Sequence, residues 1–442
     1  MGPGVDLLSS SEKFPSQAEV VVIGGGIIGV ATALSLAQRG VQTVLLEKGT
    51  VAAEQSSRNW GWCRRTGRDL RELPLIHKSM KMWEAMNALV GSETGFRREG
   101  ILYTSRTEEQ RARHLRWVEE ARHHDIHSEM LSVAQVGEKL PGLQGSVVGG
   151  LWTPLDGRAE PQKATPAMAK YAMSLGVNLQ QHCAVRTIEQ SAGRVSHVVT
   201  EHGVVNCQSV VVAGGAWSRV LMQGMGIDLP QLKVLSTVMR TRPVQSDIAF
   251  CASFGNVALR KRLDGGLTIA SSAINTADIT PDSLRFMKAF FPAFWHERSS
   301  LQLRVGKRFI EEALHWQPGH ADKISIYERI RVLDPHINPA IISQMLASLK
   351  QWLPSLGKVQ VAQSWGGLID TMPDAIPVIS GVPSSPGLYL ATGFSGHGFG
   401  IAPAAGQLMA DLVTNVTPVV DPSAFRLSRF SDGEQIRAQH WL

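Results

Sequence analysis

Three glycines and one acidic residue lie at a spacing that suits a bound dinucleotide. Gly24, Gly26 and Gly29 follow a Gly-x-Gly-x-x-Gly pattern, and Glu47 comes 18 residues after the last of them. The first glycine permits a tight turn, the second lets the backbone approach a pyrophosphate, and the third lets a helix pack closely on a strand. Glu47 is placed to accept hydrogen bonds from a ribose, so the group predicts a dinucleotide site.

These residues need particular elements to hold them. We expect a buried strand at 20–23, a helix at 27–38 and a second strand at 43–46. The helix would begin at the glycines and turn its free N–H groups and positive dipole end toward the phosphates. The uncharged stretch 20–38 also has about the length of a membrane span, but four glycines interrupt it and disfavour that alternative.

The composition is that of an ordinary globular protein. The chain has 442 residues, of which 43% are hydrophobic and 19% charged, which predicts two or three domain-sized units. Four scattered cysteines without a Cys-x-x-Cys motif argue against a zinc site or a disulfide framework, and a cytoplasmic location is expected.

The dispersed net charge of +6 suits anionic cofactors or substrates and predicts no nucleic-acid partner. Residues 1–18 show no signal-peptide pattern, and 1–16 are expected to form a loose tail.

Two later segments of the chain are expected to add strands to the nucleotide-binding unit formed by residues 20–46. An arginine-rich turn at 56–69 leads into an expected helix at 73–90. Strands are expected at 184–188, 194–200 and 209–213, and again at 388–392, where a glycine-rich segment at 393–400 precedes a helix at 402–413. A nucleotide-binding layer built from three separated pieces counts against a plain NAD dehydrogenase, whose binding unit is usually continuous.

Four blocks in this order resemble the FAD-dependent D-amino-acid oxidase superfamily, above all glycine and sarcosine oxidases, D-amino-acid dehydrogenases and related amine oxidases. The blocks are 22–29 with Glu47 and Lys48, 56–61, 210–218, and 365–377 followed by 393–399. The resemblance implies an α/β fold with a Rossmann-like FAD-binding domain and a second, β-sheet-based substrate domain. We place the FAD-binding domain at 16–90, 148–230 and 355–442, and the substrate domain at 91–147 and 231–354.

The resemblance also implies which residues hold FAD. The segment 393–400 would lie beside the flavin ring, where the positive end of the following helix stabilises anionic reduced flavin. Covalent flavin linkages in the superfamily use a late cysteine or a particular N-terminal histidine; no cysteine follows Cys251, so non-covalent FAD is expected. The cofactor-binding positions carried onto this sequence are Gly24, Gly26, Ile27, Ile28, Gly29, Glu47, Lys48, Ser57, Arg58, Asn59, Trp60, Gly61, Val185, Ala213, Gly214, Trp217, Gly393, Gly396, His397, Gly398, Phe399 and Gly400.

The implied reaction oxidises the C–N bond of an amino acid or secondary amine to an imine by hydride transfer to flavin N5, and water then hydrolyses the imine. The electron acceptor would be oxygen or a quinone-type molecule. An alternative within the superfamily is an FAD subunit of a multi-subunit opine or proline dehydrogenase, which passes electrons to a partner. An FAD hydroxylase that uses NADPH would carry a second Asp-Gly motif late in the chain that contacts the dinucleotide, and we identify no motif of this kind. The oligomeric state stays open.

Two positions depart from the oxygen-using members that the chain resembles. Some carry a lysine that assists oxygen activation in a Gly-Leu-Lys-Ile segment, where this chain has Thr268. They also carry a lysine after Gly-His-Gly-Phe that pairs with the substrate carboxylate, where this chain has Gly400. Slow use of oxygen and a carboxylate anchor from elsewhere are therefore expected.

Arg64 and Arg68 are the candidate anchors, because a guanidinium matches a carboxylate with two hydrogen bonds. The alternative is that they are solvated loop charges. Trp62 and Trp365 either wall the substrate pocket or pack in the core. His397 lies between glycines, and we expect it near the flavin without an acid–base role.

One aromatic stretch with basic neighbours, 284–295, has two interpretations. The ordinary one is an amphipathic helix that covers the substrate domain. The other is a peripheral contact with a membrane or with a partner protein.

Overall fold

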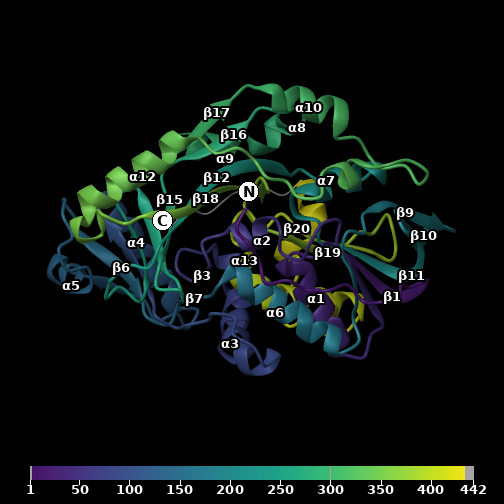
Figure 1. Ribbon diagram of the computed structural model, residues 1–442, viewed down its shortest axis with the longest axis horizontal. Coiled ribbons are helices and arrows are strands. Elements are labelled where there is room, and N and C mark those ends of the chain that lie inside the picture. Colours follow the sequence, from purple (N-terminus) through teal and green to yellow (C-terminus); the bar gives the residue numbers. More distant parts are fainter. Residues whose placement is uncertain (1, 299, 434–442) are drawn as a thin grey trace.

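Two large sheets and the helices around them form the mixed α/β fold of the computed structural model, which describes residues 2–298 and 300–433 (Figure 1). Within these residues the first sheet has eight strands and the second has ten. The first sheet contains β1 (Gln17–Ile23), β2 (Thr43–Leu46), β8 (Asn178–Gln180), β9 (Val185–Ser191), β10 (Arg194–Thr200), β11 (Gly203–Val212), β19 (Val378–Gly381) and β20 (Leu388–Thr392). The expected α/β class is confirmed.

Parallel strands from distant parts of the chain build the centre of the first sheet. Their order is β20, β11, β1, β2 and β8. Val22 in β1 pairs with Val211 of β11 and Leu45 of β2, and all three side chains are buried. Parallel strands covered on both faces are continuously apolar, and this is the signal by which β1 and β2 are recognisable in the sequence. β9 and β10 extend β11 as an antiparallel meander.

Four helices pack together beside this sheet. α1 (Ile27–Ala37) lies against α13 (Gly398–Val413), and α3 (Leu73–Val90) and α6 (Pro161–Ser174) share the same apolar core (Figure 1). Gly406 of α13 contacts Ala31 of α1 so closely that an added Cβ would stand 2.4 Å from the Ala31 carbonyl carbon. This close crossing brings the beginnings of α1 and α13 to the same region.

The second sheet is antiparallel through most of its width. It is centred on β12 (Leu232–Thr241), whose whole length pairs with β18 (Val361–Thr371). β6 and β18 belong to this sheet, although the expected boundaries assign 148–230 and 355–442 to the other domain. The remaining strands of the sheet are β4 (Ile101–Ser105), β5 (Glu129–Leu131), β6 (Gly149–Thr153), β13 (Cys251–Phe254), β14 (Val257–Lys261), β15 (Leu267–Ser271), β16 (Asn275–Asp278) and β17 (Leu301–Arg304). A separate ribbon joins β3 (Trp62–Cys63) to β7 (Gly157–Arg158).

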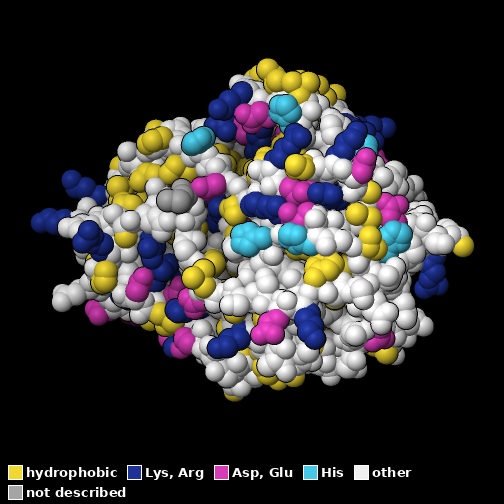
Figure 2. Space-filling view, turned by 45° about the vertical axis from the view of Figure 1, so that its right-hand side comes forward, with side chains coloured by type: hydrophobic (Ala, Val, Ile, Leu, Met, Phe, Trp, Pro, Cys, Tyr) yellow, Lys and Arg dark blue, Asp and Glu magenta, His cyan; other side chains and the backbone are white. Residues whose placement is uncertain are grey.

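The aromatic stretch near 290 is only partly buried. It forms α8 (Pro281–Arg285) and α9 (Met287–Glu297), and α9 has no buried residue. Met287, Phe291 and Trp295 are more than half exposed and lie on one stripe of the helix. Figure 2 shows hydrophobic side chains gathered at the top of the molecule, the side where Figure 1 places α8 and α10 (Lys307–His315). Within the described residues, no helix combines the length and apolarity needed to cross a bilayer.

Most expected elements are confirmed, with two differences. The helix expected at 402–413 begins earlier, at Gly398, because the glycine-rich segment already has helical geometry there. Residues 2–16, expected as a loose tail, lie along the protein: the Asp6 N–H donates to Gln162 O at 3.1 Å and the Ser11 N–H donates to Leu179 O at 2.8 Å. The helices not yet named are α2 (Gln55–Arg58), α4 (Glu108–Arg122), α5 (Val133–Lys139), α7 (Ser218–Gly224), α11 (Ile326–Arg329) and α12 (Pro339–Trp352).

We predict that Gly406→Ala destabilises the protein. The added methyl group has no room against Ala31, and overpacking costs about 1–3 kcal/mol. The matched control is Gly137→Ala in α5, where nothing lies within 4 Å of an added Cβ. Urea unfolding followed by circular dichroism should show a lower midpoint for the first variant and an unchanged or higher midpoint for the second. Equal midpoints would contradict the close crossing of α1 and α13.

Candidate active site

A cavity of about 420 Å³ lies between the two sheets, where the beginnings of α1 and α13 meet β12 and β18. Most of the predicted site residues line it. Trp62, Arg64, Arg68 and His397 do so, together with Gly24, Gly26, Ile27, Ile28, Glu47, Lys48, Arg58, Asn59, Trp60, Val185, Ala213, Gly214, Trp217, Gly396, Gly398 and Phe399. Five predicted cofactor positions, Gly29, Ser57, Gly61, Gly393 and Gly400, do not line it, and neither does Trp365.

The glycine turn has the geometry that its spacing predicts. Gly24 has φ +113°, and an added Cβ would stand 2.4 Å from Ala213 O. Gly29 supports the site from behind, because its Cβ would stand 1.9 Å from Gly24 O. Gly26 precedes α1 and has no side chain to cap it, so the N–H groups that follow Ile27 in the first turn are available to an anion. Ser56, which the sequence reasoning passed over in favour of Ser57, accepts the Ile27 N–H at 2.8 Å.

Glu47 and Lys48 line the next part of the cavity. Glu47 accepts the N–H groups of Gly25 and Gly49, each at 2.7 Å. Burial raises the pKa of the Glu47 carboxyl, and the charge of Lys48 opposes this rise. The Lys48 ammonium donates to Glu54 at 2.7 Å and stands 4.6 Å from the centre of the Trp217 ring. Each Glu47 oxygen retains a lone pair that can accept a ribose hydroxyl.

The end of the cavity beside Lys48 is aromatic. Trp217 stacks on Trp316 with ring centres 4.3 Å apart, and its indole N–H donates to Glu54 at 3.1 Å. Val185 and Tyr327 line the same cavity. Tyr327, which the sequence reasoning did not select, comes from α11 and has a buried hydroxyl without a partner.

The expected FAD fits the cavity because several polar atoms in its lining residues lack hydrogen-bond partners. Ser236 Oγ, Trp62 Nε1 and Tyr327 Oη are buried, have no hydrogen-bond partner in the described protein, and belong to residues that line the cavity. Buried polar groups are normally hydrogen-bonded, so these atoms indicate a polar ligand. Together with the open first turn of α1, they match a molecule with a pyrophosphate and several hydroxyl and ring acceptors.

Two of the predicted tryptophans have different environments. Trp62 meets Trp60 and Tyr103 edge to face, with ring centres 5.4 and 5.6 Å away, and it lines the cavity. Trp365 is 2% exposed, packs with Val238 and Ala270, and donates its indole N–H to Arg58 O at 3.1 Å. Trp365 therefore holds the turn that carries Arg58.

The arginines near the cavity differ in their partners. Arg58 donates to Asp334 at 2.7 Å and to Gly366 O at 2.8 Å. Arg68 is 1% exposed and donates to Glu72 at 3.4 Å and to His397 O at 2.8 Å. Arg64 donates only to Thr66 O and, within the described residues, has no carboxylate partner. Arg64 is thus the guanidinium in the cavity whose charge remains available to a ligand.

His397 is the residue that immediately precedes α13. Its ring lines the cavity, and 28% of its side-chain surface is exposed there. Burial, with Arg68 and Arg64 nearby, lowers the pKa of His397 well below its usual value, which favours the neutral imidazole. Asp370 of β18, which the sequence reasoning did not select, accepts the Gly393 N–H at 2.8 Å, and burial raises the pKa of Asp370 to about 6. This bond fixes the start of the glycine-rich segment to the second sheet.

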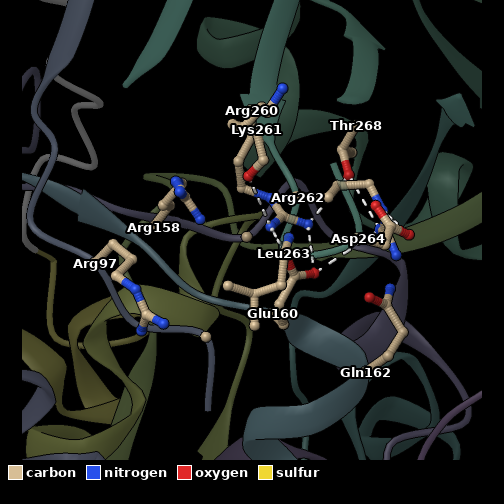
Figure 3. Close-up of polar contacts among 12 residues, drawn as sticks. Arg97, Arg158, Glu160, Gln162, Arg260, Lys261, Arg262, Leu263, Asp264 and Thr268 are labelled. Carbon is tan, nitrogen blue, oxygen red and sulfur yellow. Dashed lines mark hydrogen bonds and ion pairs between the residues drawn. The ribbon is translucent and has the colours of Figure 1, made fainter. Parts of the chain in front are cut away.

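Thr268 lies beside a buried ion pair instead of a free cation (Figure 3). Its hydroxyl accepts hydrogen bonds from Arg260 at 3.1 Å and Arg262 at 3.4 Å. Arg260 is 1% exposed and donates to both oxygens of Glu160, at 2.8 and 3.1 Å (Figure 3). The Arg260 charge is therefore compensated, and Arg260 has no free face for a substrate carboxylate. Within the described residues, no cluster of side chains suits a metal ion.

Comparison with known proteins gives a consistent result. The sequence profile of the family described as "FAD dependent oxidoreductase" matches residues 19–412. The chain is 26% identical to sarcosine oxidase subunit beta of Rhizobium meliloti, over 94% of this chain and 89% of that protein. It is 25% identical to glycine oxidase of Pseudomonas putida, over 92% and 97%. Among solved structures, L-amino acid deaminase from Proteus myxofaciens in complex with anthranilate has a TM-score of 0.94 at 30% identity, covering 98% of this chain and 97% of that one.

We predict that Gly26→Val yields a folded protein that does not retain FAD. A branched side chain at the residue before α1 would fill the space where the pyrophosphate meets the backbone. Flavin is measured in the supernatant after acid precipitation, which also shows whether it is non-covalent, and circular dichroism checks the fold. Gly137→Ala, remote from the cavity, is the control and should keep the wild-type flavin content. A Gly26→Val protein with full flavin would move the phosphate site elsewhere.

Proposed function

The chain belongs to the family of FAD-dependent oxidoreductases, and from this premise we propose that it oxidises the C–N bond of an amino acid, with its carboxylate held by Arg64. The observation that carries the proposal is the unpaired Arg64 guanidinium in a cavity that also contains Trp62 and His397. The names of the relatives support it, because sarcosine, glycine and L-amino acids all carry an amine and a carboxylate on one carbon.

The protein's part in this reaction is mainly positioning. FAD, when bound, accepts a hydride at N5 from the carbon that bears the amine. Arg64 would bind the carboxylate with two hydrogen bonds, and the aromatic group of Trp60, Trp62 and Tyr103 would exclude water from the apolar side of the substrate. Aligning the two reactants in this way supplies a large part of the rate. The imine product is then hydrolysed by water.

A quinone-type acceptor fits this site better than oxygen. A fixed positive charge near the flavin helps the first electron reach oxygen because it stabilises the superoxide that forms. Thr268 has no charge, the charge of Arg260 beside it is compensated by Glu160, and that of Arg262 is compensated by Asp264. A reducing, cytoplasmic compartment agrees with the four cysteines, all of which are buried free thiols.

A second candidate is an FAD subunit that passes electrons to a partner chain. One relative is named as a subunit of sarcosine oxidase. The exposed stripe of Met287, Phe291 and Trp295 is a surface that such a partner, or a membrane, would cover. A stable complex with a partner that carries an iron–sulfur centre would favour this candidate.

The deciding experiment is an anaerobic screen of flavin bleaching. The purified holoenzyme is mixed with amino acids of both hands, N-methyl amino acids and simple amines. Rapid bleaching by an amino acid, and none by the matching amine without a carboxylate, is the expected result. Bleaching by amines alone, or by none of these compounds, would reject the proposed substrate class.

We predict that Arg64→Ala raises KM for the amino-acid substrate by about 30-fold or more, because loss of one partner of a desolvated ion pair costs about 2–5 kcal/mol. FAD content should not change. Arg122→Ala, an exposed arginine at the end of α4, is the matched control and should keep the wild-type KM. Arg68→Ala is expected to raise KM as well, but also to loosen His397, since Arg68 donates to its carbonyl. An unchanged KM in Arg64→Ala would place the carboxylate elsewhere.

We predict that the reduced enzyme reacts slowly with oxygen and quickly with an artificial quinone or phenazine acceptor. The physical reason is the compensated charge around Thr268. The measurement is stopped-flow reoxidation of photoreduced enzyme in air-saturated buffer, beside the same enzyme with a quinone under argon. Reoxidation by oxygen as fast as turnover with the better acceptor would contradict the prediction and make the protein an oxidase.

A further inference from the structure

A buried carboxylate stands behind His397, outside the cavity. Glu72 ends the short 3-10 turn Leu70–Glu72 just before α3 and is 1% exposed. Its Oε1 is paired with Arg68 at 3.4 Å. Its Oε2 lies 3.8 Å from Nδ1 of His397, and neither atom has a hydrogen-bond partner among residues 2–298 and 300–433. Two unsatisfied buried atoms of complementary chemistry thus face each other.

The surrounding contacts hold this arrangement in place. Arg68 contacts both members, since it pairs with the Glu72 carboxylate and donates to the His397 carbonyl at 2.8 Å. The His397 N–H donates to Phe394 O at 2.7 Å. These bonds fix the His397 backbone, from which the ring extends with Nδ1 3.8 Å from Glu72 Oε2. Nε2 is not sealed in the same way, and the ring lines the cavity.

The charges that face the pair come from one loop. They are Arg64 and Arg68, which lower the pKa of His397 after the larger effect of burial, and Asp69, which faces Glu72. Burial raises the pKa of Glu72, while Arg68 opposes the rise. Burial thus favours a neutral imidazole at His397, while the paired Arg68 charge favours the carboxylate form of Glu72. A single proton between Oε2 and Nδ1 would satisfy both orphaned atoms at once.

Oxidation of an amino acid requires a neutral amine, although the amine of a free amino acid is protonated near neutral pH. We propose that Glu72 and His397 form a proton-accepting dyad, in which Glu72 accepts the Nδ1–H so that Nε2 takes the ammonium proton of the bound substrate. The N–H bond of the ammonium breaks, the Nε2–H bond forms, and the nitrogen keeps its electron pair. His397 is the catalytic residue and Glu72 is a positioning residue. This inference rests on the proposed amino-acid oxidation.

The carboxylate and the amine of one substrate then have separate partners in the same cavity. Arg64 takes the carboxylate, and Nε2 of His397 takes the proton. A conformational role of His397 alone would leave no reason for an acid with an unsatisfied oxygen directly behind its ring. The Glu72 charge would instead stabilise the imidazolium that forms, as a buried carboxylate does for a catalytic histidine.

The test is the pH dependence of kcat/KM for the best amino acid found in the bleaching screen. In His397→Gln, we expect a loss of about 10²–10⁴-fold near neutral pH. The rate should then rise with a slope of one and recover as the pH approaches the pKa of the substrate's own ammonium group. Glu72→Gln should change the profile in the same direction. Glu119→Gln, which removes an equal charge from the exposed face of α4, is the matched control and should keep the wild-type profile.

A second measurement does not depend on turnover. Nitrogen NMR of histidine-labelled holoenzyme, with His397→Gln used for assignment, should show the Nδ1–H tautomer in the wild type. In Glu72→Gln the amide donates to Nδ1, so the Nε2–H tautomer should replace it. If Glu72→Gln does not fold or loses FAD, the wild-type tautomer decides: an Nε2–H form rejects the dyad.

The outcomes separate this inference from the proposed function. Wild-type pH profiles in both variants, or an equal loss at every pH, would overturn the dyad while the bleaching of wild-type enzyme by amino acids still stands. If no amino acid bleaches the wild-type flavin, the proposed function fails first. A pH-dependent loss that recovers at high pH, with the tautomer change, supports the dyad.

Discussion

The close crossing of α1 and α13 is the constraint on which the site depends. The two helices come from opposite ends of the chain and touch through Gly406 and Ala31, where no side chain larger than hydrogen fits at position 406. Because they cross so closely, both begin at the same cavity. One beginning carries Gly26 and the other carries His397. Two positive helix ends therefore point into one cavity, which suits a ligand that is anionic in its phosphates and becomes anionic at its ring.

The second sheet closes this cavity, and buried ion pairs join it to the first layer. Arg58 reaches Asp334 and Gly366 O, and Arg260 reaches Glu160 and Trp60 O. A buried arginine without a partner would be costly, so each of these charges is compensated where it stands. Arg64 is left with a backbone carbonyl only. The distribution of partners, more than the number of arginines, separates structural charges from a charge that a substrate can use.

The same reasoning applies to the groups around His397. Arg68 connects Glu72 with the backbone of His397, so the loop that offers Arg64 to the carboxylate also orients the imidazole. The proposed carboxylate anchor, Arg64, and the residues that hold the proposed proton acceptor, Arg68 and Glu72, therefore lie on one short segment. The charge environment on the other side, at Thr268, has no net cation. Under the proposed function the substrate side of the site is therefore basic, whereas Thr268, which does not line the cavity, stands beside a compensated charge.

Elements with local signals could be predicted from the amino-acid sequence. The glycine turn, its strand and helix, Glu47 and the helix at 73–90 follow from residue spacing and apolar periodicity, because steric limits on φ and ψ and the burial of one face act within a few residues. Family resemblance extended this prediction to FAD and to the amino-acid oxidising class.

Which polar side-chain atoms are left without a hydrogen-bond partner is set by the tertiary structure. Trp365 and Trp62 look alike in the sequence, yet one donates to Arg58 O and the other has an unsatisfied N–H at the cavity. No local motif singles out Glu72 or Asp370. Glu72 matters because a contact across more than 300 residues sets it beside His397. Asp370 matters because a contact across more than 20 residues sets it beside Gly393. Such contacts depend on the packing of whole elements, which no local pattern of residues contains.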